Sequence, residues 1–157
     1  MKLNLECQNN LRNDYINISS TPIPGDLIAE HNCTFGIGRY DNLSQIVEDE
    51  SIEEIVFNKP INVIDPNNVM VCLQHWKNKL MVGGILKLYF IDIVKVSRDI
   101  VNGTRPLDQL HQMIFGNYEF KSIISYPIIK NALNNLDMEI LTVEMNGHSV
   151  GLSCKKP

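Results

Sequence analysis

The sequence predicts a single α/β domain, in which a mostly parallel sheet carries helices on both faces and a C-terminal antiparallel β-hairpin closes the chain. Short strand-like runs alternate with segments of helical spacing, the pattern of a doubly wound sheet. Asn146-Gly147 separates the last two strand-like runs, and this dipeptide favours a two-residue hairpin turn. No linker or low-complexity segment interrupts residues 1–157, so we expect one domain.

Three short strands are expected in the first forty residues, at Lys2–Leu5, Tyr15–Ile18 and Cys33–Ile37. Asn9-Asn10 and Asn13-Asp14 supply turn residues between the first two. Residues 21–25 contain two prolines and a glycine, which predicts a loop.

The middle of the chain predicts a strand between two helices. Asp41 or Asn42 can cap a short helix that runs to about Val47, and the β-branched and aromatic run at 54–57 predicts a buried strand. Asp65-Pro66 is typical of a helix start. This helix is expected to reach about residue 80, because apolar residues recur at steps of three and four: Val69, Cys72, Leu73, Trp76 and Leu80. Trp76 is therefore expected in the core.

The second half predicts a strand, three helices and the hairpin. Gly83-Gly84 is expected to end the preceding helix and start a strand at 85–90. Helices are expected at 92–101, from Pro106 to about 115, and from Ser125 to about 136. The hairpin strands are expected at 139–144 and 149–153.

Composition excludes several classes of function. The net charge is −4, so the whole chain shows no electrostatic attraction for nucleic acid, and Lys155-Lys156 is too short a basic cluster to change this. The acidic residues at 48–50 and 53–54 are expected in a solvated loop. No apolar stretch reaches the ~20 residues of a membrane-spanning helix.

The cysteines predict free thiols and no metal site. Cys7, Cys33, Cys72 and Cys154 are widely spaced without a C-x-x-C pair, which favours a reducing compartment such as the cytoplasm. His31 lies two residues from Cys33, but a zinc site needs four convergent ligands, and the other histidines and cysteines show no paired spacing.

Four strings, in order over about the first 95 residues, resemble short class I S-adenosylmethionine-dependent methyltransferase-like proteins of bacteria and phages, which have a Rossmann-like fold. Leu3-Asn4-Leu5 followed by residues 6–10 resembles the first strand and glycine loop, and residues 15–19 resemble the second strand. Residues 51–56 resemble the approach to the fourth strand, and 83–88 the glycine-glycine turn and fifth strand. The final hairpin is similar to the family's inverted last strands.

The resemblance implies a pocket for S-adenosylmethionine lined by Leu5, Glu6, Cys7, Gln8, Ser19 and Asn58. In the resembled family, glycines at the positions of Glu6 and Gln8 let the backbone approach the methionine part of the cofactor. The Glu6 carboxylate here would repel the cofactor's carboxylate, or it would pair with its amino group. Ser19 replaces an aspartate that accepts hydrogen bonds from the ribose hydroxyls, and residues 61–65 lack the family's leucine-glutamate-histidine motif.

Two functional hypotheses follow. The first is a methyltransferase-like pseudoenzyme without catalytic residues or cofactor, which acts as a binding or structural module for a protein partner or a second copy of itself. A phage-encoded module would work in the host cytoplasm or in the virion. The alternative is an active methyltransferase with a diverged pocket, acting on a small molecule, sugar or protein, because methyl transfer mostly requires positioning. A Rossmann-like binder of another nucleotide is a third reading.

Overall fold

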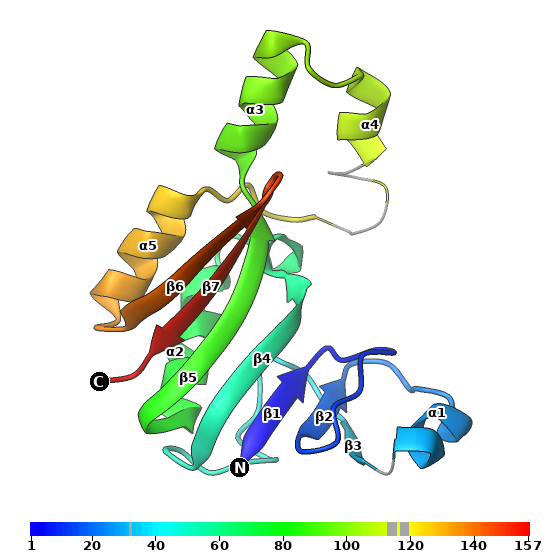
Figure 1. Ribbon diagram of the computed structural model, residues 1–157. Helices are drawn as coiled ribbons and strands as arrows, with labels where there is room; N and C mark the ends of the chain where they lie inside the picture. Colours follow the sequence, from blue (N-terminus) through cyan, green and yellow to red (C-terminus); the bar gives the residue numbers. More distant parts are fainter. Residues whose placement is uncertain (32, 113–115, 117–119) are drawn as a thin grey trace.

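A computed structural model describes residues 1–31, 33–112, 116 and 120–157. It contains one seven-stranded sheet with the strand order β3-β2-β1-β4-β5-β7-β6 (Figure 1). Neighbouring strands from β3 to β5 are parallel, and β7 is antiparallel to both β5 and β6. The predicted mostly parallel sheet with a closing antiparallel hairpin is therefore confirmed.

Helices separate β2 from β3 and β4 from β5, but β1 is followed directly by β2 and β3 directly by β4. The strands are β1 Lys2–Leu5, β2 Ile16–Ser19, β3 Thr34–Ile37, β4 Ile52–Pro60, β5 Leu80–Ile91, β6 Glu139–Asn146 and β7 Ser149–Lys155. The helices are α1 Gly25–His31, the 3₁₀ turn η1 Ile61–Val63, α2 Val69–Lys79, α3 Ile93–Asn102, α4 Leu107–His111 and α5 Tyr126–Asn135.

Local sequence signals place α3 and α5 correctly. The Asp92 carboxylate caps α3 by accepting a hydrogen bond of 2.8 Å from the Val94 N–H, and Gly103 ends the helix in the left-handed conformation. Pro127 lies in the first turn of α5, where the missing N–H has no cost. The helix expected from Pro106 to about 115 corresponds to α4. Residues 113–115, where that helix is expected to end, lie outside the described residues.

Three expected boundaries are wrong. The helix expected from Asp41 or Asn42 to Val47 is a turn, in which the Ile46 and Val47 N–H groups both donate to the Leu43 carbonyl. The second helix begins at Val69 and not at Asp65-Pro66, because the Asp65 carboxylate instead accepts from the Asn67 N–H in a preceding turn. The hairpin turn is formed by Gly147-His148, since Asn146 still pairs with Ser149.

Gly83-Gly84 lies inside β5 and does not start it. The helix ends at Lys79, and the strand runs through both glycines to Ile91. A Cβ on Gly84 would lie 2.9 Å from the carbonyl oxygen of Ile52 on β4, so glycine permits the close approach of these strands. The chain also contains α1, which the sequence analysis did not predict; it follows the prolines of residues 21–25.

One face of the sheet buries the core under α2 and α5. Alternate strand residues point to this face, and the largest buried side chains include Leu3, Ile55 and Phe90. Trp76 of α2 is fully buried, as predicted, with its ring 4.9 Å from that of Phe57 and its indole N–H donating to the Tyr40 carbonyl at 2.7 Å. Figure 1 shows α2 behind the sheet, whereas the opposite side of β4 and β5 faces the viewer without a covering helix.

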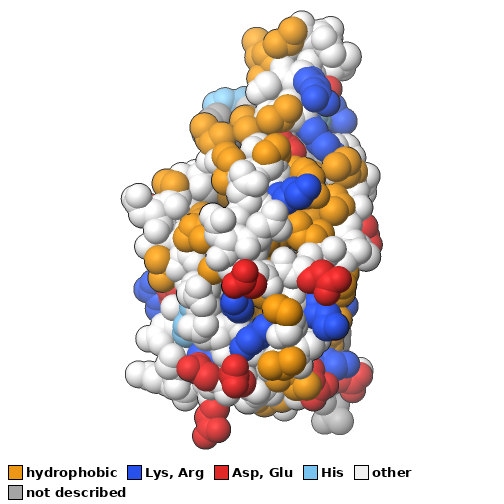
Figure 2. Space-filling view, turned by 90° about the vertical axis from the view of Figure 1, so that its left-hand side faces the viewer, with side chains coloured by type: hydrophobic (Ala, Val, Ile, Leu, Met, Phe, Trp, Pro, Cys, Tyr) orange, Lys and Arg blue, Asp and Glu red, His pale blue; other side chains and the backbone are white. Residues whose placement is uncertain are grey.

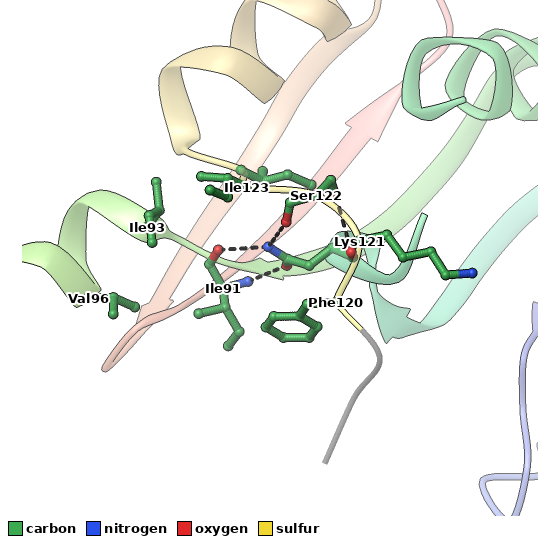
Figure 3. Close-up of a pocket in the computed structure, with 9 residues that line it drawn as sticks. Ile91, Ile93, Val96, Phe120, Lys121, Ser122 and Ile123 are labelled. Carbon is green, nitrogen blue, oxygen red and sulfur yellow. Dashed lines mark hydrogen bonds between the residues drawn. The ribbon is translucent and has the colours of Figure 1, made fainter. Parts of the chain in front are cut away.

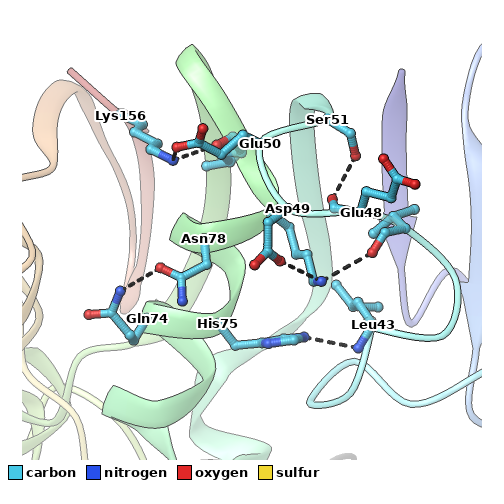
Figure 4. A network of polar contacts seen from close by, with 12 residues as sticks. Leu43, Glu48, Asp49, Glu50, Ser51, Gln74, His75, Asn78 and Lys156 are labelled. Carbon is cyan, nitrogen blue, oxygen red and sulfur yellow. Dashed lines mark hydrogen bonds and ion pairs between the residues drawn. The ribbon is translucent and has the colours of Figure 1, made fainter.

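The connection from β3 to β4 is held against α2 by polar contacts (Figure 4). The buried Lys79 ammonium lies 2.6 Å from Asp49 and donates to the Val47 carbonyl at 3.1 Å. The Leu43 N–H donates to His75 Nε2 at 2.9 Å. His75 is thus a structural acceptor. Residues 48–50 form the expected exposed acidic loop, with Asp49 ion-paired to α2, whereas Glu53 and Glu54 lie in β4 and not in a loop.

We predict that stability falls with acidification because of His75. Burial lowers the pKa of His75 below its ordinary value of about 6.5, so the unfolded chain takes up the proton first. The contribution of neutral His75 to the free energy of unfolding is complete above a pH of about 6.5. It is lost as the pH falls from there toward the lower pKa of His75 in the folded state. Urea unfolding should show that the free energy of unfolding falls less between pH 7.5 and 5.5 for His75→Ala than for the wild type. An equal loss in both proteins, with His111→Ala as the control, would contradict this.

Candidate functional site

The candidate site lies where β1, β2 and β4 end at the same edge of the sheet. The strand order reverses between β1 and β4, and in open α/β sheets ligands bind outside the carboxyl ends of the strands at such a switch point. Leu5 ends β1, Ser19 ends β2 and Asn58 lies near the end of β4. The fold therefore brings the sequence-predicted positions together at one edge of the sheet.

The loop after β1 has the backbone of a glycine turn without the glycines. Glu6 has φ of 51° and Gln8 has φ of 43°, both in the left-handed region. This conformation costs a side-chain-bearing residue about 1–2 kcal/mol. The turn is closed by hydrogen bonds from the Asn10 N–H to the Cys7 carbonyl at 2.6 Å and from the Cys7 N–H to the Ile18 carbonyl at 3.2 Å.

The Glu6 side chain turns into the protein and is paired there. Its side chain is 1% exposed, and its Oε2 lies 2.8 Å from the Lys59 ammonium and accepts from the Ser20 hydroxyl at 3.0 Å. Its other oxygen, Oε1, is buried and has no hydrogen-bond partner within the described residues. One carboxylate thus joins the ends of β1, β2 and β4.

Buried amides hold the strand ends beneath this ion pair. Asn4 and Asn17 are fully buried, and the Asn4 amide donates to Asn17 Oδ1 at 2.6 Å and to the Asn10 carbonyl at 2.7 Å. The Asn58 amide donates to Asn4 Oδ1 and to the Leu5 carbonyl, and it accepts from Asn10 at 2.9 Å. These contacts fix the loop that carries Glu6 to Gln8.

The other predicted positions differ in their accessibility. The Ser19 hydroxyl is buried and accepts from the Thr21 N–H at 3.2 Å. Cys7 is 1% exposed, and burial raises the pKa of its thiol to about 11, whereas Gln8 is exposed. The sequence analysis missed Lys59 and Ser20, although each directly follows a predicted position. It also missed Asn4 and Asn17, whose matching places in adjacent parallel strands were a usable signal.

A second cavity, of about 290 Å³, lies beside the end of β5 (Figure 3). The Asn62 side chain supports one wall, accepting from the Ile91 N–H at 2.9 Å and donating to the Ile91 and Ser122 carbonyls. Most of the other lining residues are apolar, including Ile91, Ile93, Val96, Phe120, Ile123 and Ile124. Such a lining suits an apolar group.

Comparison with known proteins identifies the fold. No protein-family model matches the chain, and no curated protein is detectably similar to it in sequence. The solved structure of an S-adenosylmethionine-dependent methyltransferase from Mesorhizobium loti superposes with a TM-score of 0.68 at 10% identity, covering 99% of this chain and 90% of that one. The PH0226 protein from Pyrococcus horikoshii gives 0.69 at 14% identity, with 99% and 81% covered.

A third neighbour was solved with a cofactor product bound. It is the Burkholderia thailandensis 1,6-didemethyltoxoflavin-N1-methyltransferase with bound 1,6-didemethyltoxoflavin and S-adenosylhomocysteine, at a TM-score of 0.69 and 7% identity, covering 99% of this chain and 70% of that one. The chain thus has the fold of class I S-adenosylmethionine-dependent methyltransferases. At these identities the likeness concerns the fold alone.

Two further classes of site were searched for in the described part of the chain. Among those residues, no group of three or more His, Cys, Asp or Glu side chains is placed to hold a metal ion. No helix there is long and apolar enough to cross a membrane. All four cysteines are free, as predicted.

We predict that Asn17→Ala destabilises the fold strongly. The Asn17 amide also donates to the Arg12 and Thr34 carbonyls, and its oxygen accepts from the Arg12 N–H at 2.9 Å. Each buried group left unsatisfied costs about 1–3 kcal/mol. Chemical denaturation measures the loss, with Asn131→Ala on the exposed face of α5 as the matched control. A loss no larger than that of the control would show that the amide network is unimportant.

We predict that the native protein exposes one reactive thiol. Burial raises the pKa of Cys7 and of Cys72 to about 11 and that of Cys154 to about 12, so all three remain protonated at pH 8. Cys33 is partly exposed. A colorimetric thiol assay should show one rapid equivalent, absent in Cys33→Ser, and four equivalents in denaturant for the wild type. Rapid labelling of Cys7 by mass spectrometry would contradict its burial.

Proposed function

We propose that this chain is a methyltransferase-like domain that does not bind S-adenosylmethionine at the end of β1 and acts as a non-catalytic binding module for a protein partner. The buried Glu6–Lys59 pair carries this proposal. The Glu6 carboxylate and its ammonium partner take up the place that glycine leaves free in the resembled family. The residues at this edge of the sheet therefore do not fit the cofactor.

The ribose position supports the same conclusion. A ribose hydroxyl needs an acceptor that faces the crevice. Ser19 is fully buried, and its oxygen already accepts from the Thr21 N–H. Asp65, the acid of the stretch after β4, accepts from the Asn67 N–H in an exposed turn. The polar groups of Glu6 and Ser19 thus point into the protein, and the carboxylate of Asp65 is engaged within its own turn.

A binding role is compatible with the surfaces that remain. The apolar cavity beside β5 suits an apolar side chain or ring. Free, mostly buried thiols suit a reducing compartment, so we place the module in the cytoplasm, and its bacterial or phage origin remains a prediction. We treat the 157 residues as one domain because one sheet includes all seven strands.

The experiment is a calorimetric titration with S-adenosylmethionine and S-adenosylhomocysteine. We expect no saturable heat at millimolar ligand and no increase in Tm, because binding to the native state alone raises stability by mass action. Saturable binding in the micromolar range would overturn the proposal. S-adenosylhomocysteine has no methyl group to transfer, so any heat in its titration comes from binding and not from a reaction.

A second candidate is an active methyltransferase, and one observation favours it. Glu6 Oε1 is buried without a partner in the described residues, and the amino group of S-adenosylmethionine could donate to it. In that case Glu6→Gln should weaken cofactor binding at least tenfold, while Glu139→Gln on exposed β6 should leave it unchanged. Binding that is absent before and after both substitutions would exclude this candidate.

A further inference from the structure

Basic side chains surround a cavity of about 370 Å³ above the turn between β6 and β7. The cavity is lined by Lys95, Arg98, Asp99, Arg105, Gly147 and His148. It shares no lining residue with the Glu6 cluster or with the apolar cavity beside β5.

Helix geometry brings three of these residues to one face. Arg98 and Asp99 lie three and four residues after Lys95 on α3, so each of them neighbours Lys95 on the surface of the helix. Gly103 ends the helix in the left-handed conformation and turns the chain toward Arg105. The β6–β7 turn closes the other side, where His148 is 7% exposed.

The ionic contacts within the cavity leave two cations uncompensated. Among the described lining residues Asp99 is the only acidic one, and its Oδ2 lies 2.6 Å from His148 Nε2 and 3.3 Å from Arg105 Nε. The Lys95 ammonium donates to the Gly147 carbonyl at 3.2 Å, which is a neutral partner. Within the residues that the structure describes, Arg98 forms no ion pair. The cavity therefore carries a net positive charge.

This charge contrasts with the rest of the molecule. The whole chain has a net charge of −4. Figure 2 shows basic side chains with few acidic ones in the upper part of one face, at the level of α3, whereas basic and acidic side chains are mixed in its lower part. Local positive charge in an acidic protein concentrates an anion at that place.

We propose that this cavity binds the phosphate group of a small-molecule phosphomonoester. A dianion matches the two uncompensated cations, and the planar guanidinium of Arg98 offers two parallel donors to phosphate oxygens. The Asp99 carboxylate, held by His148 and Arg105, stays available to accept from a hydroxyl of the same ligand. A nucleic acid would extend past the recess, and the net charge of −4 on the whole chain disfavours its phosphate backbone.

The test is calorimetry at low ionic strength with two probes, inorganic phosphate and adenosine 5′-monophosphate. We expect saturable binding of both, and at least tenfold weaker binding in Lys95→Gln/Arg98→Gln. The matched control is Lys77→Gln/Lys130→Gln, which removes the same charge from α2 and α5 and should bind as the wild type does. Thermal unfolding monitored by circular dichroism checks that each variant is folded, and Arg98→Gln alone, which breaks no ion pair, should weaken binding severalfold.

Three results would overturn the proposal. The first is the absence of saturable binding to the wild type, and the second is equal binding by the wild type and by Lys95→Gln/Arg98→Gln. The third is tighter binding of a short DNA duplex than of adenosine 5′-monophosphate to the wild type, with the duplex no longer bound by Lys95→Gln/Arg98→Gln. This result would assign the two cations to a nucleic-acid backbone. Each result is independent of the titrations with S-adenosylmethionine.

Discussion

The structure depends on the parallel pairing of β1 with β2 across a connection of only ten residues, 6–15. Parallel strands usually need a crossover of a dozen or more residues, most often a helix, and no helix lies in this one. Its backbone groups cannot bond within a helix, so the buried side chains of Asn4 and Asn17 bond to them. The tight turn in turn requires the left-handed backbone at Glu6 and Gln8.

The Glu6–Lys59 pair follows from that turn. Because the backbone at Glu6 is fixed, its side chain points toward the ends of β2 and β4, where water is excluded. A buried ion pair adds little net stability, but removing one partner leaves a costly unpaired charge. Backbone strain and a buried pair at a switch point are typical of a site under functional constraint. In this chain both features lie together at the end of β1.

Helix caps and turn residues, which act locally, predicted most of the fold. The features that they did not predict depend on contacts between residues far apart in the sequence. Asp92, Gly103 and Pro127 act within their own helices, so the ends of α3 and α5 could be predicted from the sequence. The segment 42–47 has a good capping residue, yet the Leu43 N–H bonds to His75 across 32 residues, which favours a turn. Glu6 could be identified as anomalous, but its partner Lys59 lies on another strand and becomes apparent only when β1 and β4 pair.

The proposed binding places lie at α3 and not at the end of β1. Helix α3 begins directly after β5, and its residues line two cavities: Ile93 and Val96 the apolar one, Lys95 and Arg98 the basic one. Because Lys95 and Val96 are adjacent on one helix, an apolar ligand and an anion bound at these places would both act on α3. Under the proposals made above, α3 is therefore the one element that contacts both the apolar ligand and the anion.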